Sequence, residues 1–178
     1  GSDGEVSPEG FETRYNTELA NEYGNLASRT LSMINSFRDG VVPTAQPSAE
    51  IVAEFEGLLE AVTARIDEVE LTAALDEVWR RIKRLNRYVQ DEQPWKLAKD
   101  PAEAERVDEV LYTLAEGLRV VSVLLHAFMP IKAAQLLAAL GREDLSLDDA
   151  RLGAVEGGAK VGELGQLFPR VEAEAPAA

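Results

Sequence analysis

Apolar side chains recur at intervals of three and four residues along most of this 178-residue chain, and this spacing constrains the fold more than any other feature. Residues spaced in this way share one face of an α-helix. The first such stripe consists of Phe11, Tyr15, Leu19, Tyr23, Leu26, Thr30, Met33 and Phe37. It predicts one long helix that starts at Ser7-Pro8, or two helices that meet near Gly24, with an end at Asp39-Gly40.

Four further helices are predicted by the same period. Their expected bounds are Ser48 to Ile66, Leu71 to Val89, Pro101 to Leu125, and Pro130 to Gly141. Ser48 offers a capping hydroxyl, and Pro94 prevents the helix that begins near Leu71 from continuing. No segment shows the alternation typical of a β-strand. The sequence therefore predicts an all-α fold, an antiparallel bundle of about five helices over residues 1–142.

The character of the chain changes after residue 142. Glycine becomes frequent and the helical period fades, so we expect residues 143–178 to form a less regular tail. Such a tail would pack on the bundle or on another part of the protein. The last residues, which end in AEAPAA, are expected to be disordered.

Composition restricts the chemistry. The net charge of −14 argues against non-specific coating of nucleic acid, which depends on neutralised phosphates. There is no cysteine, and the one histidine, His126, lies in an apolar run, where a packed residue is expected. We therefore expect no catalytic residue and no metal site in this chain. No apolar run is long enough to span a bilayer, so no membrane contact and a cytoplasmic setting are expected.

Three local features depart from this plain pattern. Asn25 and Arg29 are four residues apart, so they share a helix face, and together they offer donors and an acceptor that suit the edge of an unpaired base. Trp95 directly follows the helix-ending Pro94, where it is either a core residue or a stacking platform. Trp79 is the better candidate for the core. Residues 78–100 carry seven basic and three acidic side chains, a local positive charge that is either a solvated helix face or a nucleic-acid contact.

The motifs around these residues resemble the anticodon-binding domain of bacterial methionyl-tRNA synthetases. The resemblance rests first on ELANEYGNLASR at 18–29, NRYV at 86–89 and PWKLAKD at 94–100. Shorter matches follow in the family's order: VLY at 110–112, EGLR at 116–119, FMPI at 128–131 and LG at 140–141. The likeness extends from about residue 4 to about residue 171.

The resemblance implies a recognition site for the CAU anticodon of tRNA-Met. In it, the tryptophan that matches Trp95 stacks on an anticodon base, and the residues that match Asn25 and Arg29 hydrogen-bond base edges. The basic side chains expected to hold the RNA backbone are Arg80, Arg84, Arg87 and Lys96.

The resemblance also implies a parent enzyme that attaches methionine to tRNA with ATP and magnesium. Its catalytic domain would precede this segment, and the tail could return to that domain. The segment alone should be inactive, without a cofactor, and monomeric. Two alternatives stay open at this stage: the bundle of a sibling class I synthetase, and an acidic protein–protein interaction domain anchored by Trp95.

Overall fold

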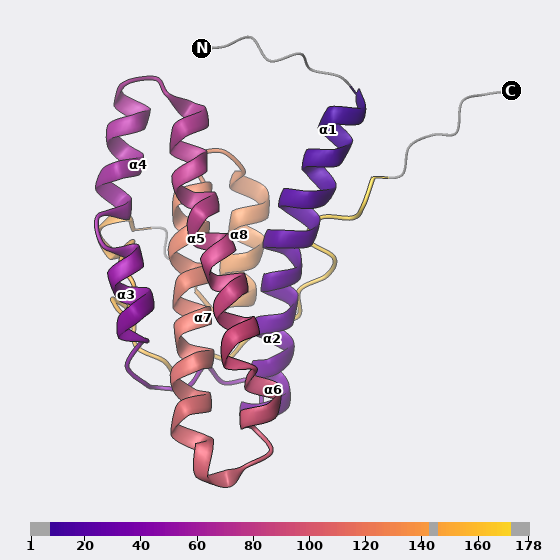
Figure 1. The fold of residues 1–178 in the computed structure, drawn as a ribbon, viewed down its shortest axis with the longest axis vertical. Coiled ribbons are helices and arrows are strands. Elements are labelled where there is room, and N and C mark those ends of the chain that lie inside the picture. Colours follow the sequence, from indigo (N-terminus) through magenta and orange to yellow (C-terminus); the bar gives the residue numbers. More distant parts are fainter. Residues whose placement is uncertain (1–7, 143–145, 172–178) are drawn as a thin grey trace, which may run out of the picture.

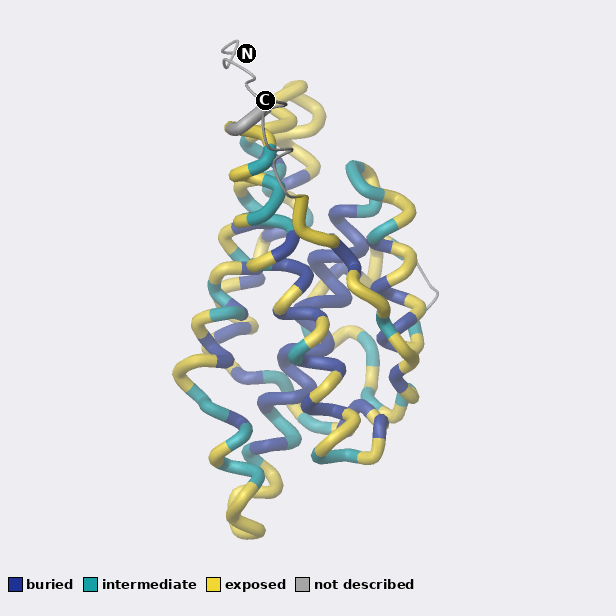
Figure 2. Tube along the Cα trace, turned by 90° about the vertical axis from the view of Figure 1, so that its right-hand side faces the viewer, coloured by how far each residue is buried: buried dark blue, intermediate teal, exposed yellow. Residues whose placement is uncertain are grey.

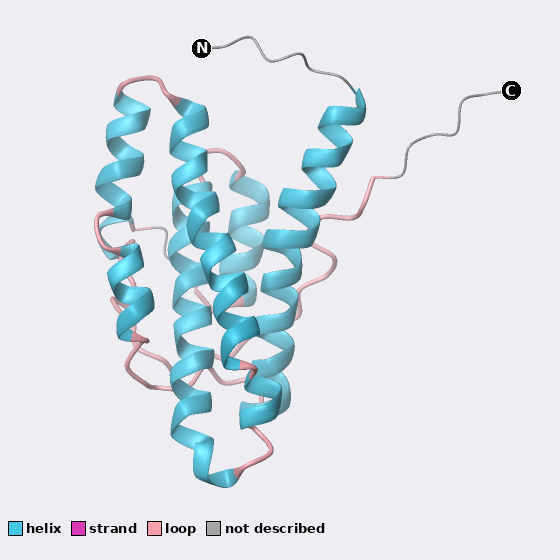
Figure 3. Ribbon diagram, viewed as in Figure 1, coloured by secondary structure: helices cyan, strands magenta, loops and turns pink. Residues whose placement is uncertain are grey.

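The structure is a computed structural model that describes residues 8–142 and 146–171. Helices pack up and down in a bundle, and the described ranges contain no strand, which confirms the predicted all-α class (Figures 1 and 3). One helix, α7 (Ala104–Leu125), occupies the middle of the bundle. Every residue from 110 to 125 is buried, because other elements cover this helix on all sides (Figure 2).

The N-terminal run consists of α1 (Pro8–Arg14), η1 (Tyr15–Gly24) and α2 (Asn25–Arg38). These segments follow one another without a break, but η1 is wound as a π-helix. The backbone N–H of Asn25 accordingly donates to the carbonyl oxygen of Ala20, five residues earlier. The winding thus changes at Gly24, where the sequence allowed two helices to meet. α2 ends at Asp39, whose φ of 52° is left-handed, as predicted.

The helix expected from Ser48 to Ile66 is in fact two, α3 (Ala49–Phe55) and α4 (Leu58–Asp67). The break falls at Gly57, whose φ of 70° lies in the left-handed region that a glycine adopts at little cost. The capping role predicted for Ser48 is also wrong, since its side chain makes no capping hydrogen bond. Its backbone N–H donates instead to the hydroxyl of Thr113, at 2.9 Å, which joins the start of α3 to α7.

The remaining helices are α5 (Leu71–Glu92), α6 (Pro94–Leu97), η2 (Pro101–Glu103) and α8 (Pro130–Ala139). Their starts agree with the predictions, and α5 extends one turn beyond the expected end at Val89. α5 lies very close to α7 at Gly117, since this residue has no side chain. A Cβ added there would come within 2.8 Å of the Leu85 side chain. Gly141, with a φ of 71°, follows the end of α8 as predicted.

Beyond residue 145 the described chain crosses the surface of the bundle. After a short turn, η3 (Leu147–Asp149), it pairs with the segment that follows α2: the N–H of Val42 donates to the carbonyl of Ala159, at 2.9 Å. Farther on, Phe168 is buried against η1. The division of the chain at residue 142 stays a prediction. The disorder expected at the end concerns residues 172–178, which lie outside the described residues.

A buried ion pair attaches this surface segment to α7. Glu116 and Arg119 each have side chains only 4% exposed, and Arg119 donates to both oxygens of Glu116, at 2.7 and 2.9 Å. The guanidinium also donates to the carbonyls of Asp149 and Arg151, and Glu116 accepts the backbone N–H of Gly153. The two buried charges thus satisfy each other in part, and backbone groups after residue 145 supply their further hydrogen bonds.

The core contains the aromatic residue predicted for it. Trp79 is 9% exposed and packs against Tyr23, which is fully buried. The Tyr23 hydroxyl lies 2.7 Å from that of Ser122, which donates to the carbonyl of Leu118. Tyr23 therefore ties η1 to α7 through a hydrogen bond as well as through packing.

Candidate nucleic-acid interface

Trp95 lies on a single turn of helix that directly follows the end of α5. Gln93 closes α5 with a left-handed φ of 47°, and Pro94 then takes the first position of α6. A proline is well placed there because its missing N–H would have no partner in the first turn. Pro94 is buried and Trp95 is half-buried, with its ring partly packed on the core. A short turn is expected from the sequence at residues 94–98, and the structure has a single turn of helix there.

Arg29 of α2 covers the ring of Trp95. Its guanidinium carbon lies 5.6 Å from the centroid of the indole ring, a distance typical of a cation–π contact. Arg29 has no other partner among the described residues, and its side chain is half-buried. The structure therefore brings together two of the candidate residues, although they come from different helices.

Asn25, the third candidate, is the first residue of α2 and lies one helical turn from Arg29 on the same face. It is exposed, and no described residue hydrogen-bonds its side-chain amide. The Asn25 amide is therefore not consumed by the backbone of the described residues. An open amide and a guanidinium thus share one face of α2, and the guanidinium contacts the ring of Trp95.

Asn86 joins α5 to η1, the two helices that directly precede α6 and α2. Its side-chain nitrogen donates to the carbonyl of Glu22 in η1, at 3.1 Å, and to that of Ile82 in its own helix, at 3.2 Å. The winding of η1 ahead of α2 is in this way tied to α5, which ends just before Trp95. The sequence motif contained Asn86 but gave no role for it. The available clue was an asparagine in a helix interior, where that residue is unfavourable without a specific bond.

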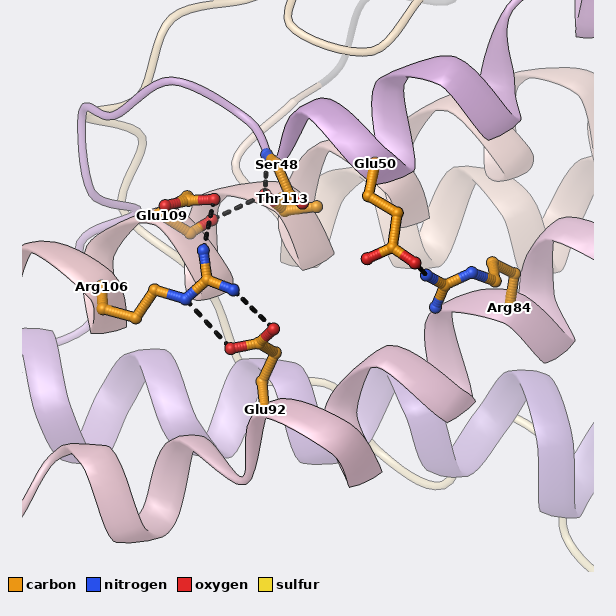
Figure 4. A network of polar contacts seen from close by, with 7 residues as sticks. All are labelled: Ser48, Glu50, Arg84, Glu92, Arg106, Glu109 and Thr113. Carbon is orange, nitrogen blue, oxygen red and sulfur yellow. Dashed lines mark hydrogen bonds and ion pairs between the residues drawn. The ribbon is translucent and has the colours of Figure 1, made fainter.

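The four basic candidates differ in their surroundings. Arg84 is only 14% exposed and pairs with Glu50 and Glu54 of α3, the second at 3.2 Å (Figure 4). Arg80 pairs with Glu77 of its own helix. Arg87 and Lys96 are exposed and have no ion pair within the described part of the chain. A phosphate contact by Arg80 or Arg84 would therefore require an exchange of partners, whereas the other two are available.

A second network, which the sequence analysis missed, surrounds the guanidinium of Arg106 near the start of α7. It binds both carboxylate oxygens of Glu92, the last residue of α5, and one oxygen of Glu109 (Figure 4). The hydrogen bonds to Glu92 raise the pKa of Arg106 above its ordinary value. This network lies three residues from Trp95 along the chain.

The described residues contain no group of three or more histidine, cysteine, aspartate or glutamate residues that could hold a metal ion. No described helix is long and apolar enough to cross a membrane. His126 is half-buried at the end of α7. What the arrangement can do is stack on a flat ring and hydrogen-bond its edge.

Comparison with known proteins agrees with this reading. Residues 40–177 match the family described as the anticodon binding domain of methionyl tRNA ligase. The methionine–tRNA ligase of Deinococcus radiodurans is 43% identical over 169 residues, 92% of this chain and 25% of the relative. That of Bacillus subtilis is 38% identical over 185 residues, 98% of this chain and 27% of the relative. The chain thus spans about a quarter of the length of these relatives.

Solved structures give the same result. The apo methionyl-tRNA synthetase of Mycobacterium tuberculosis is similar with a TM-score of 0.84 and 33% identity, over 95% of this chain and 36% of that one. The same enzyme bound by methionyl-adenylate has a TM-score of 0.84 and is 34% identical, and the match covers 92% of this chain and 34% of that one. The family match favours the methionine enzyme over its sibling synthetases. The chain belongs to the family of anticodon-binding domains of methionyl-tRNA ligases.

Proposed function

We propose that this module recognises the CAU anticodon of tRNA-Met. Trp95 provides the stacking platform for one base, and Asn25 and Arg29 bond base edges. The observation that carries the proposal is the contact of Arg29 with the Trp95 ring, which sets an edge-reading group beside a stacking surface, and Asn25 lies one helical turn from Arg29. Unstacked bases of RNA loops are read by this combination.

Exposed cations complete the proposed interface. Arg87 and Lys96, which flank the end of α5, would contact the phosphate backbone around the stacked base. They are suited to this role because no described carboxylate neutralises them. A local positive charge also offsets the repulsion that a chain of net charge −14 exerts on RNA.

The direct test is a titration of Trp95→Ala with a CAU anticodon stem-loop. Base–aromatic stacking contributes roughly 1–3 kcal/mol, so we expect binding to weaken at least about tenfold while the helix content stays unchanged. Phe11→Ala is the matched control, since Phe11 is 63% exposed and lies on α1, at the other end of the bundle (Figure 1). Equal affinities of wild type and Trp95→Ala would refute the stacking role.

We further propose that the module serves a longer protein that attaches methionine to tRNA. The support is its relatives, which are methionine–tRNA ligases about four times its length, and one similar structure that is bound by methionyl-adenylate. In such a protein ATP, with magnesium, would act in a separate catalytic domain. A monomeric, cytoplasmic enzyme is the form that we propose.

We propose that the catalytic domain contacts an apolar groove far from Trp95, because that domain would precede this segment and α1, where the described chain begins, lines the groove. The groove has a volume of about 680 Å³ and is lined by Phe11, Leu75, Trp79 and Met129, among others. In a full-length protein, Phe11→Asp should lower the rate of aminoacylation, because it places a charge on this surface, while Phe11→Leu should not. The affinity of the isolated module for the stem-loop should be unchanged in both. Full aminoacylation by Phe11→Asp would place the catalytic domain elsewhere.

A further inference from the structure

The guanidinium of Arg106 binds Glu92, so a paired hydrogen bond joins the two ends of the segment that contains Trp95. Arg106 donates through Nε and Nη2 to the two oxygens of Glu92, at 3.0 and 2.5 Å, and through Nη1 to Glu109, at 2.7 Å. Glu92 ends α5 and Arg106 lies in the first turn of α7. Between them lie the left-handed Gln93, the turn α6 and η2. A parallel pair of hydrogen bonds fixes both the distance and the orientation of its two ends.

The same network reaches beyond the ion pair. Glu109 offers its backbone carbonyl to the hydroxyl of Thr113, at 2.7 Å, and that hydroxyl accepts the N–H of Ser48 (Figure 4). The backbone of α7 at Glu109, whose carboxylate binds Arg106, is thus joined through Thr113 to the start of α3. Arg106 therefore connects the end of α5 to the rigid centre of the bundle.

Packing provides a second anchor for α6 but leaves the ring of Trp95 partly exposed. Pro94 is buried and Leu97 is half-buried against the core, on either side of Trp95. These contacts hold the backbone of α6. The end of α5 determines the direction in which α6 departs, because Gln93 changes the course of the chain between the two helices.

We infer that Arg106 is a positioning residue for Trp95, which presets the stacking platform before RNA arrives. The inference rests on the proposed function only for its effect on binding. A side chain already held in its bound geometry avoids the cost of being ordered on association. From the usual size of that cost, loss of the clamp should weaken stem-loop binding roughly 2- to 12-fold.

The test separates position from binding. In a Trp79→Phe background Trp95 is the remaining tryptophan, so its emission maximum and its quenching by acrylamide report its surroundings without RNA. We expect Arg106→Gln to shift the emission to the red and to increase quenching. Arg106→Lys keeps the charge but not the paired hydrogen bonds, so it should restore the signal only in part.

Arg65→Gln is the matched control. Arg65 also binds surface carboxylates, Glu68 and Glu70, but at the far corner between α4 and α5, and its loss changes the net charge equally. It should leave both Trp95 emission and stem-loop affinity as in the parent. Far-UV circular dichroism and urea midpoints identify any variant that is not folded; Glu92→Gln then provides the same test from the other partner.

The outcomes are distinct. If Trp95 emission and quenching are the same in Arg106→Gln, Glu92→Gln and the parent, the positioning role is overturned. If they shift but stem-loop affinity is unaffected by both Arg106→Gln and Trp95→Ala, the clamp is supported and the proposed anticodon role fails. A shift together with the 2- to 12-fold loss supports both.

Discussion

The guanidinium carbon of Arg29 lies 5.6 Å from the centroid of the Trp95 ring, so the side chain expected to read a base edge also covers the surface on which that base would stack. A base and the guanidinium cannot occupy the same face at the same distance. Under the proposed function, recognition is therefore an exchange. Arg29 gives up a cation–π contact and gains hydrogen bonds to the base that replaces it.

This exchange predicts that Arg29→Ala mainly lowers discrimination. The substitution removes the edge donors but leaves the ring of Trp95 free, so affinity for CAU should fall toward that for single-base anticodon variants. Titration with a set of such stem-loops measures this. Arg29→Lys keeps the charge without the planar fork and should not restore discrimination. A uniform loss for every RNA would show that Arg29 contacts only phosphate.

Asn86 should contribute to stability through the hydrogen bonds that its side-chain nitrogen donates, more than through the size of its side chain. Asn86→Ala removes the bonds to Glu22 and Ile82 but improves the helix propensity of α5, so a net loss of about 1 kcal/mol in unfolding free energy is expected. Asn86→Asp, of equal size, places a carboxylate against two carbonyls and should cost more. Urea denaturation compares the three proteins. Equal stability of Asn86→Asp and wild type would contradict the proposed bridge.

The buried pair of Glu116 and Arg119 should be among the most sensitive positions for stability. Glu116→Gln leaves the Arg119 charge uncompensated in the interior, which typically costs about 3–5 kcal/mol. Hydrogen exchange should then become faster at the amide of Gly153, whose acceptor is altered. Glu109→Gln, at a more exposed ion pair, is the comparison and should cost far less. Similar midpoints for the two variants would mean that water reaches the Glu116 site.

Stability should fall in alkali because of Tyr23. Burial raises the pKa of Tyr23 above its ordinary value of 10.0, while the hydrogen bond to Ser122 lowers it in part. The unfolded chain loses this proton first, so the free energy of unfolding declines as the pH rises above about 10. Tyr23→Phe should be less stable at pH 7, by about 1 kcal/mol, but its decline should be shallower. Some decline remains, since the pKa values of Tyr88 and Tyr112 are raised too. An equal slope in both proteins would contradict this assignment.

The helices could be predicted wherever local chemistry determined them. The apolar stripe of α7 and the prolines that open α6 and α8 act within a few residues, so the positions of these helices follow from the sequence. The break at Gly57 could not be read in this way, because Leu58, Leu59 and Val62 continue the helical spacing past it. A π-helix in η1 was equally hidden, since the apolar residues Tyr15, Leu19 and Tyr23 are four apart, a spacing that an α-helix gives as well.

The site was harder to predict than the fold, because its geometry depends on residues far apart in the chain. Asn25 and Arg29 share a face by helical spacing alone, but nothing in their spacing places Trp95 against Arg29. The basic stretch of α5 illustrates the same limit. Arg84 looked available for RNA, yet its guanidinium binds the carboxylates of Glu50 and Glu54. These residues lie 34 and 30 positions before it in the chain.

The attachment of Arg119 to the carbonyls of Asp149 and Arg151 has a consequence for synthesis on the ribosome. The chain emerges from its N-terminal end, so α7 leaves the exit tunnel while the residues that satisfy its buried guanidinium are still behind it. Until they arrive, the nascent bundle holds a charge that lacks part of its acceptors. The last step of folding must therefore wait for the C-terminal segment, and a chain truncated before residue 149 would remain incompletely folded.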